Sequence, residues 1–306
     1  MELLYFLEGL RTPALDAFFS LITNFGDETL FIVFGLLFFW CIDKREGYYL
    51  LCVGLLGTVV NQFLKLLCRV PRPWVRNPDF TIVESARAGA TGYSFPSGHT
   101  QTSVGVYGGV IRWTGKSVAS LLCGILCVLV PLSRMYLGVH TPADVGVSIA
   151  VALVLIFVLY PIVYKGCDNP KTMRTFFAAM LAIALGYLAF VTFYAFPADV
   201  DAGNLAHGVK NAYTMLGCIA GVWTIWEIDR TLIRFETKAP LPVQAVKLGL
   251  GFALLLGIKA GLKSPLYALT GGHYAADFVR YFLMVVFAGS VWPLTFPWLT
   301  QKLSRI

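Results

Sequence analysis

The residues best placed for chemistry lie in three short segments, and the segment SRMYLGVHTPAD contains the most informative set. It places Arg134, His140 and Asp144 at fixed intervals beside a strongly apolar stretch. Thr141 and Pro142 are typical of an N-cap and a first helical position, so we expect His140 at the start of a helix. Asp144, one turn further on, can accept the proton on Nδ1 and leave Nε2 free to attack phosphorus. Arg134 can hold a phosphate oxygen.

The other two segments supply positive charge and a helix start. KLLCRVPRP places Lys65 near the end of a predicted helix and Arg72 just after it, a point charge and a planar fork that together suit a phosphoryl dianion. In PSGH, Ser97 can cap the next helix and Gly98 lets the backbone approach a ligand closely. Free N–H groups at that helix start attract anions, and His99 stands beside them able to donate a proton.

Each segment also has a purely structural interpretation. Lys65, Arg72 and Arg134 can extend toward the membrane interface from helix ends. PSGH can be an ordinary helix cap followed by an interfacial histidine, and His140 with Asp144 can be a satisfied polar pair. Ionisable residues beside apolar spans are nevertheless functional candidates by default, which favours the chemical interpretation.

The composition indicates an integral membrane protein. The chain has 306 residues, of which 57% are hydrophobic and only 13% charged. The net charge of +7 comes from basic residues scattered between apolar segments, so we attribute it to membrane orientation and an anionic substrate and expect no nucleic-acid partner.

The apolar segments predict an all-α, polytopic transmembrane helix bundle, because a spanning helix needs about 20 apolar residues. We predict an interfacial amphipathic helix in residues 1–24, although a cleaved signal peptide remains an alternative, then a catalytic transmembrane core in 25–196 and about three additional transmembrane helices in 197–306. The nine predicted spans are 27–42, 47–68, 98–114, 117–136, 142–164, 173–196, 209–228, 243–262 and 277–299.

Charge asymmetry between the connections predicts the orientation. By the positive-inside rule, the side that collects the following residues is cytoplasmic: Lys44, Arg45, Arg112, Lys116, Lys165, Lys171, Arg174, Arg230, Arg234, Lys238, Lys302 and Arg305. The opposite side receives the proline-containing loop 69–97 and the turn around Gly138. All three segments therefore meet at the extracytoplasmic face.

The three segments together are specific. K-x6-R-P at 65–73, P-S-G-H at 96–99 and S-R-x5-H-x3-D at 133–144 resemble the three-part signature of the phosphatidic acid phosphatase type 2 superfamily, with every signature position filled. The resemblance covers residues 65–144, and the spans in 27–196 are similar to that family's six-helix catalytic core.

The resemblance implies a role for each residue. His140 is the nucleophile that forms a phosphohistidine, Asp144 orients it, and His99 is the general acid and then the base. The implied phosphate-binding residues are Lys65, Arg72, Ser97, Gly98 and Arg134. The scheme requires no metal and no other cofactor.

Polar residues of the C-terminal third are possible additions to the site, because we expect them at the same outer face. They can equally anchor helix ends and loops. They are Lys259, Lys263, His273, Asp277 and Arg280.

The sequence thus predicts a multi-pass enzyme of the cell membrane that hydrolyses the phosphomonoester or diphosphate of a lipid. Its partners are the phosphorylated lipid and the surrounding membrane lipids, and the sequence leaves the oligomeric state open. Two alternatives remain: a phosphotransferase that uses the same intermediate, and a lipid-binding or transport protein on the same fold.

Overall fold

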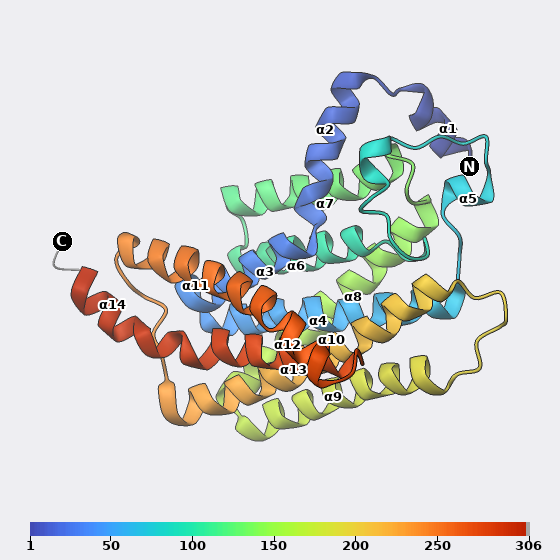
Figure 1. Cartoon of the computed structure of the whole chain (residues 1–306). Helices are drawn as coiled ribbons and strands as arrows, with labels where there is room; N and C mark the ends of the chain where they lie inside the picture. The colour runs from blue at the N-terminus through green and yellow to red at the C-terminus, as the bar shows by residue number, and fades with distance from the viewer. Residues whose placement is uncertain (304–306) are drawn as a thin grey trace. The chain divides into compact units, whose positions relative to one another are not determined.

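The computed structural model describes residues 1–303, which fold into helices joined by loops and contain no strand (Figure 1). The α-helices are α1 (Glu2–Gly9), α2 (Pro13–Thr23), α3 (Glu28–Leu37), α4 (Lys44–Cys68), α5 (Pro73–Arg76), α6 (Gly98–Thr114), α7 (Val118–Tyr136), α8 (Pro142–Asp168), α9 (Pro170–Phe193), α10 (Ala202–Ile228), α11 (Leu241–Gly261), α12 (Lys263–Leu269), α13 (Ala275–Val286) and α14 (Phe296–Leu303). Short 3-10 or π turns are η1 (Asn24–Gly26), η2 (Phe38–Ile42), η3 (Glu84–Ala86), η4 (Asp229–Ile233), η5 (Phe287–Val291) and η6 (Pro293–Thr295).

The helices confirm a multi-pass membrane protein. All nine predicted spans fall on helical segments. Within residues 1–303, however, six segments are long and apolar enough to cross a membrane, or seven if a bent pair counts as one span. The six are Lys44–Arg76, Val118–Tyr136, Pro142–Asp168, Pro170–Phe193, Leu241–Leu269 and Ala275–Leu303. The predicted spans 98–114 and 209–228 fall short of that standard. α6 has only 17 residues, and α10 begins with a polar segment.

The N-terminal segment differs from the prediction of one amphipathic helix. Residues 1–24 form two helices, because Thr12 caps a new start and Pro13 occupies the first position of α2. Segment Pro13–Gly26 then meets Glu28–Ile42 at an angle of 51°. α2 packs against α7 (Figure 1), and Arg11 donates from Nε to the carbonyl of Tyr136 at 3.2 Å.

The described chain forms two compact units. Unit 1 comprises Met1–Ile32, Leu50–Pro161 and Ala195–Gly208, and unit 2 comprises Val33–Tyr49, Ile162–Tyr194 and the chain from Val209. The three signature segments all belong to unit 1. Within it, α6 and α7 pack side by side (Figure 1) after a tight connection in which Gly115 adopts a φ of +63°.

The long loop 69–97 is ordered by its contacts within unit 1. Val83 N–H donates to the carbonyl of Leu137, and Ser94 N–H donates to the carbonyl of Val70. Ala86 joins Leu137 in a buried apolar cluster beneath the loop. Gly138 completes the turn that faces the loop, and its φ of +81° explains why glycine stands there. The loop is therefore held directly over the turn that precedes α8.

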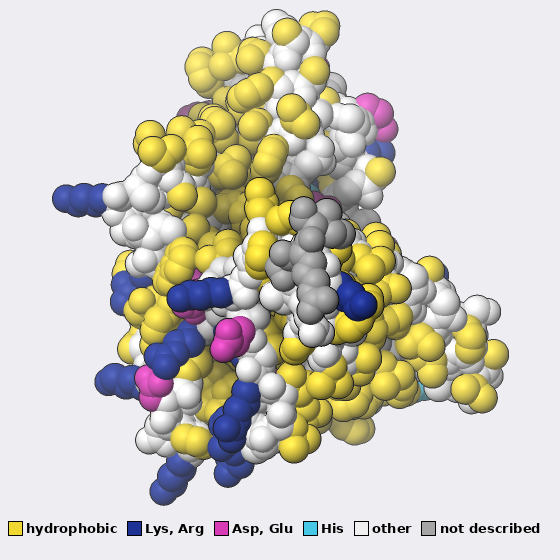
Figure 2. Space-filling model, turned by 90° about the vertical axis from the view of Figure 1, so that its left-hand side faces the viewer, with side chains coloured by type: hydrophobic (Ala, Val, Ile, Leu, Met, Phe, Trp, Pro, Cys, Tyr) yellow, Lys and Arg dark blue, Asp and Glu magenta, His cyan; other side chains and the backbone are white. Residues whose placement is uncertain are grey.

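Helix ends in unit 2 are joined by ion pairs. Lys44 at the start of α4 contacts Asp229 at 2.8 Å, and Arg174 of α9 contacts Glu227 of α10 at 2.6 Å. These cations belong to the set predicted to face the cytoplasm, of which Arg305 lies outside the described residues. Figure 2 shows a face of the molecule on which Lys and Arg side chains outnumber those of Asp and Glu.

Candidate active site

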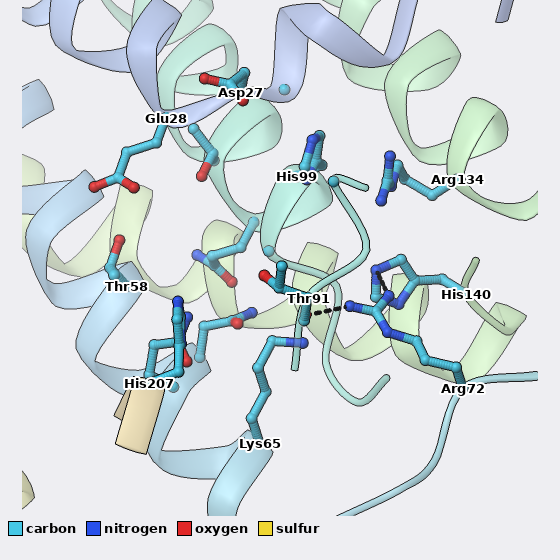
Figure 3. A pocket seen from close by; sticks show the side chains of 17 residues that line it. Asp27, Glu28, Thr58, Lys65, Arg72, Thr91, His99, Arg134, His140 and His207 are labelled. Carbon is cyan, nitrogen blue, oxygen red and sulfur yellow. Dashed lines mark hydrogen bonds between the residues drawn. The ribbon is translucent and has the colours of Figure 1, made fainter. Parts of the chain in front are cut away.

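A cavity of about 230 Å³ in unit 1 brings together residues from all three signature segments. It is lined from α4, the loop 69–97, the start of α6, the end of α7 and the turn before α8. In Figure 3, Lys65 reaches in from α4, while Arg72 lies beside His140 and Arg134 lies near His99. Six of the eight core residues predicted from the sequence line it: Lys65, Arg72, Gly98, His99, Arg134 and His140.

Arg72 fixes both the loop and the imidazole of His140. Its guanidinium donates to the carbonyls of Thr91, Gly92 and Val139 at 2.6, 3.1 and 3.0 Å, and Nη1 lies 2.9 Å from Nε2 of His140 (Figure 3). A guanidinium can only donate, so Nε2 must be the unprotonated nitrogen and Nδ1 must carry the proton. The lone pair on Nε2 therefore faces the cations of the cavity.

Asp144 lies behind the imidazole at the start of α8. Thr141 and Asp144 form the predicted cap: Thr141 N–H donates to Oδ2 at 2.7 Å, and Asp144 N–H donates to Oγ1 of Thr141 at 3.3 Å. Ser94 Oγ also donates to Oδ2, at 2.6 Å. Oδ2 lies 3.4 Å from Nδ1 of His140, which is longer than an ordinary N–H···O bond, so this contact is mainly electrostatic.

The surroundings of His140 favour a neutral imidazole. The side chain is 2% exposed in the turn between two spans, and burial together with the charges of Arg72, Arg134 and Lys65 lowers the pKa of His140 well below its usual range. The ring therefore keeps the Nε2 lone pair that a nucleophile requires.

Two further cations complete the positive side of the cavity. Arg134 is 2% exposed, and its Nη1 donates to Oγ1 of Thr23 at 2.6 Å. Within residues 1–303, Nε of Arg134 has no hydrogen-bond partner. Lys65 is 6% exposed, and its ammonium donates to the carbonyl of Tyr93. Three buried cations with unused donor capacity suit a tetrahedral dianion such as a phosphoryl group.

The start of α6 is held against the start of α8. Ser97 caps α6 by accepting from Thr100 N–H at 3.4 Å, as predicted. Ser97 N–H donates to the carbonyl of Asp144, and Ser148 Oγ donates to the carbonyl of Ser97. These bonds tie together two helix N-termini, each of which presents free N–H groups and a positive dipole end. His99 is the second residue of α6, so the start of this helix places it in the cavity.

The five candidate residues of the C-terminal third do not line the cavity. Lys259, Lys263 and His273 are exposed, whereas Asp277 and Arg280 form a buried pair at 2.5 Å. All five belong to unit 2, so the cavity is built without them. Their participation in the site remains a prediction.

Several cavity residues were missed by sequence reasoning. Asn61 and Gln101 line the cavity, as do Asp27 and Glu28. Asn61 lies one helical turn before Lys65, so the i, i+4 spacing could have identified it. Asp27 and Glu28 carry no comparable signal in the sequence, because only the bend between α2 and α3 places them in the cavity wall. Among the described residues, no group of three or more His, Cys, Asp or Glu side chains could hold a metal ion.

The fold and the cavity define the class: an integral multi-pass membrane protein with three histidines, His99, His140 and His207, in a cation-lined pocket. Comparison with known families identifies the family. The PAP2 superfamily model matches residues 45–167, and the model of the PAP2 superfamily phosphatase transmembrane extension matches residues 213–304. The chain belongs to the PAP2 superfamily. The second model also accounts for the C-terminal helices, which the three signature segments do not reach.

Curated relatives are similar over part of the chain. Phosphatidylglycerophosphatase B of Bacillus subtilis (strain 168) is 29% identical over 177 residues, 52% of this chain and 78% of that protein. Sphingosine-1-phosphate phosphatase 1 of Rattus norvegicus is 28% identical over 147 residues, 46% of this chain and 33% of that protein. An undecaprenyl-diphosphatase of Bacillus subtilis (strain 168) is 26% identical over 154 residues, 49% of this chain and 76% of that protein. The chain thus spans about a third of the rat protein. No solved structure matches.

Proposed function

We propose that this protein is a membrane phosphatase that hydrolyses a phosphorylated lipid through a phosphohistidine on His140. The observation that supports this most directly is the position of His140 in a cation-lined cavity, with Arg72 on its unprotonated Nε2 and Asp144 behind the ring beside Nδ1. Family membership and the names of the relatives support a lipid phosphate as the substrate.

The first step transfers the phosphoryl group to the imidazole. The Nε2 lone pair of His140 forms a bond to phosphorus as the bond between phosphorus and the ester oxygen breaks. His99 gives its proton to that oxygen, so the lipid leaves as a neutral alcohol. Arg72 must release Nε2 as the phosphoryl group enters, and it then donates to the oxygens along with Lys65 and Arg134.

The second step releases phosphate. A water molecule gives a proton to His99 and attacks phosphorus, and the bond from phosphorus to Nε2 breaks and returns its electron pair to the ring. Asp144 opposes the positive charge that the ring carries while it is phosphorylated. The three cations supply the charge stabilisation throughout, so we expect turnover in the presence of a chelator.

We also propose that the site faces the extracytoplasmic side of the cell membrane. Lys44 and Arg45 begin α4 and Lys65 lies near its other end, so a straight helix separates them by about 30 Å, the thickness of a bilayer core. If the basic end is cytoplasmic, the cavity is not. With the native cysteines replaced, Ser85→Cys and Lys171→Cys should react with an impermeant thiol reagent from opposite sides of the membrane.

The test of the function is a phosphate-release assay with and without the nucleophile. The wild type should release phosphate from a lipid phosphate or diphosphate in the presence of a chelator, and vanadate, which mimics five-coordinate phosphorus, should inhibit it. His140→Ala should abolish release and also the acid-labile phosphoenzyme that the wild type forms with labelled substrate. Near-normal turnover by His140→Ala, or a strict magnesium requirement, would refute the mechanism. Transfer of label to a second lipid would show a phosphotransferase instead.

A further inference from the structure

Two buried amide side chains line the cavity without a function in the proposed chemistry. Asn61 of α4 is 3% exposed and Gln101 of α6 is 4% exposed. Within residues 1–303, three of their polar atoms have no hydrogen-bond partner: Oδ1 and Nδ2 of Asn61 and Nε2 of Gln101. Buried polar groups in folded proteins are nearly always paired, so these three atoms are available to a polar group that enters the cavity.

The two amides lie on the helices that carry Lys65 and His99. Asn61 precedes Lys65 by one turn of α4, and a Cβ on Gly98 would lie 3.8 Å from its Oδ1. Gln101 follows His99 on α6, and a Cβ on Gly57 would lie 3.0 Å from its Nε2. In the proposed mechanism the three cations hold the phosphoryl oxygens and His99, on the same helix as Gln101, protonates the leaving oxygen, so we assign a group bound at the two amides to the alcohol.

The unpaired atoms are one acceptor and two donors. A hydroxyl group has the complementary set, because it donates one hydrogen bond and accepts two. We propose that Asn61 and Gln101 form a subsite for a hydroxyl group that the lipid carries within a few atoms of its phosphate ester. This inference rests on the proposed phosphatase function and adds a substrate class: phosphomonoesters with a free neighbouring hydroxyl.

Other groups complement the three atoms less well. The second phosphate of a diphosphate only accepts, so it would leave Oδ1 of Asn61 unpaired. An ammonium group only donates, so it would leave Nδ2 of Asn61 and Nε2 of Gln101 unpaired. A phosphatidate with both glycerol oxygens esterified has no hydroxyl to offer. A site that must pair buried polar atoms discriminates strongly against a substrate that lacks the partner.

The test compares two lipids that differ in one hydroxyl group: a lysophosphatidate and its 2-deoxy analogue. For the wild type we expect kcat/KM to be at least tenfold higher with the hydroxyl, which corresponds to about 1.4 kcal/mol. Asn61→Leu and Gln101→Met keep side-chain size and remove the amide. Each should bring the preference to threefold or less. Gln301→Met, the same change at an exposed position of α14, should leave the preference intact.

Binding separates this inference from the proposed function. Phosphonate analogues of the two lipids cannot be hydrolysed, and their dissociation constants from the detergent-solubilised wild type should differ by at least tenfold. Equal affinities, or a preference that survives in Asn61→Leu, would overturn the subsite whether or not the protein turns over lipids. Discrimination in binding without turnover of any lipid phosphate would support the subsite and refute the phosphatase.

Discussion

Replacing Asp144 with Asn removes one negative charge behind the nucleophile and little else. The amide oxygen of Asn can still accept from Thr141 N–H and from Ser94 Oγ, which now donate to Oδ2 at 2.7 and 2.6 Å. The cap of α8 therefore survives, and we expect the midpoint of thermal unfolding in detergent to stay within a few degrees of the wild type. The change acts on the charge that the imidazole acquires during the reaction.

The separation of the two groups sets the size of the effect. Nδ1 of His140 and Oδ2 of Asp144 are 3.4 Å apart, and both side chains are 2% exposed. At an effective dielectric constant of about 20, two unit charges at that distance attract by about 5 kcal/mol. Because about 1.4 kcal/mol corresponds to a factor of ten, kcat should fall by about 10³ to 10⁴. The carboxylate does not touch the substrate, and its loss makes the cavity more positive, so KM should not rise.

The assay is steady-state phosphate release by purified Asp144→Asn in detergent, with kcat and KM determined separately. Asp168→Asn is the matched control, since it makes the same change in an exposed residue at the other end of α8. A kcat within tenfold of the wild type would refute the assignment of Asp144. If Asp144→Asn lowers the free energy of unfolding by as much as it raises the activation free energy, Asp144 is a structural residue.

Two further predictions concern the histidines. His99→Ala should slow release of a poor leaving group such as a lipid alcohol by about 10² to 10⁴, while a p-nitrophenyl ester, which needs no proton, is hydrolysed much faster by comparison. An equal loss with both esters would exclude His99 as the acid. Burial and neighbouring cations lower the pKa of His140, so Nε2 should become protonated only well below pH 6.5. After correction for the substrate phosphate, the profile of kcat/KM should show its acidic decline well below pH 6.5, and a decline centred at 6.5 would contradict this.

Much of the local architecture was predictable because short-range rules decide it. The starts of α6 and α8 follow from Ser97, Thr141 and Pro142, whose preferences act within one turn of helix. The length of the apolar segments was enough to predict where the long helices lie. The division of residues 1–24 into α1 and α2 was missed, although Thr12 and Pro13 carry the same cap signal that was recognised before α8.

The cavity wall depends on how helices meet, which no single segment records. Asn61 faces Gly98 only because α4 and α6 approach closely, and Gly57 permits that approach because a Cβ there would press on Gln101. Asp27 enters the cavity through the bend between η1 and α3. The acidic and amide residues follow from packing between elements, whereas the motif residues carry a local signal. Sequence reasoning therefore found the cations and histidines and missed the polar residues around them.

The arrangement of charge explains why the site is built on helix ends. Lys65, Arg72 and Arg134 are each at most 6% exposed, and burying several cations together costs several kcal/mol per ion unless an anion compensates. Asp144 supplies one negative charge, and it lies behind His140 rather than among the cations. Asp27 and Glu28 also line the cavity, and in the proposed mechanism the phosphoryl group adds negative charge where the cations meet Nε2. The N-terminal ends of α6 and α8, at Gly98 and Pro142, add to the positive charge of the cavity. A dianion next to Nε2 is therefore the group that the site stabilises most.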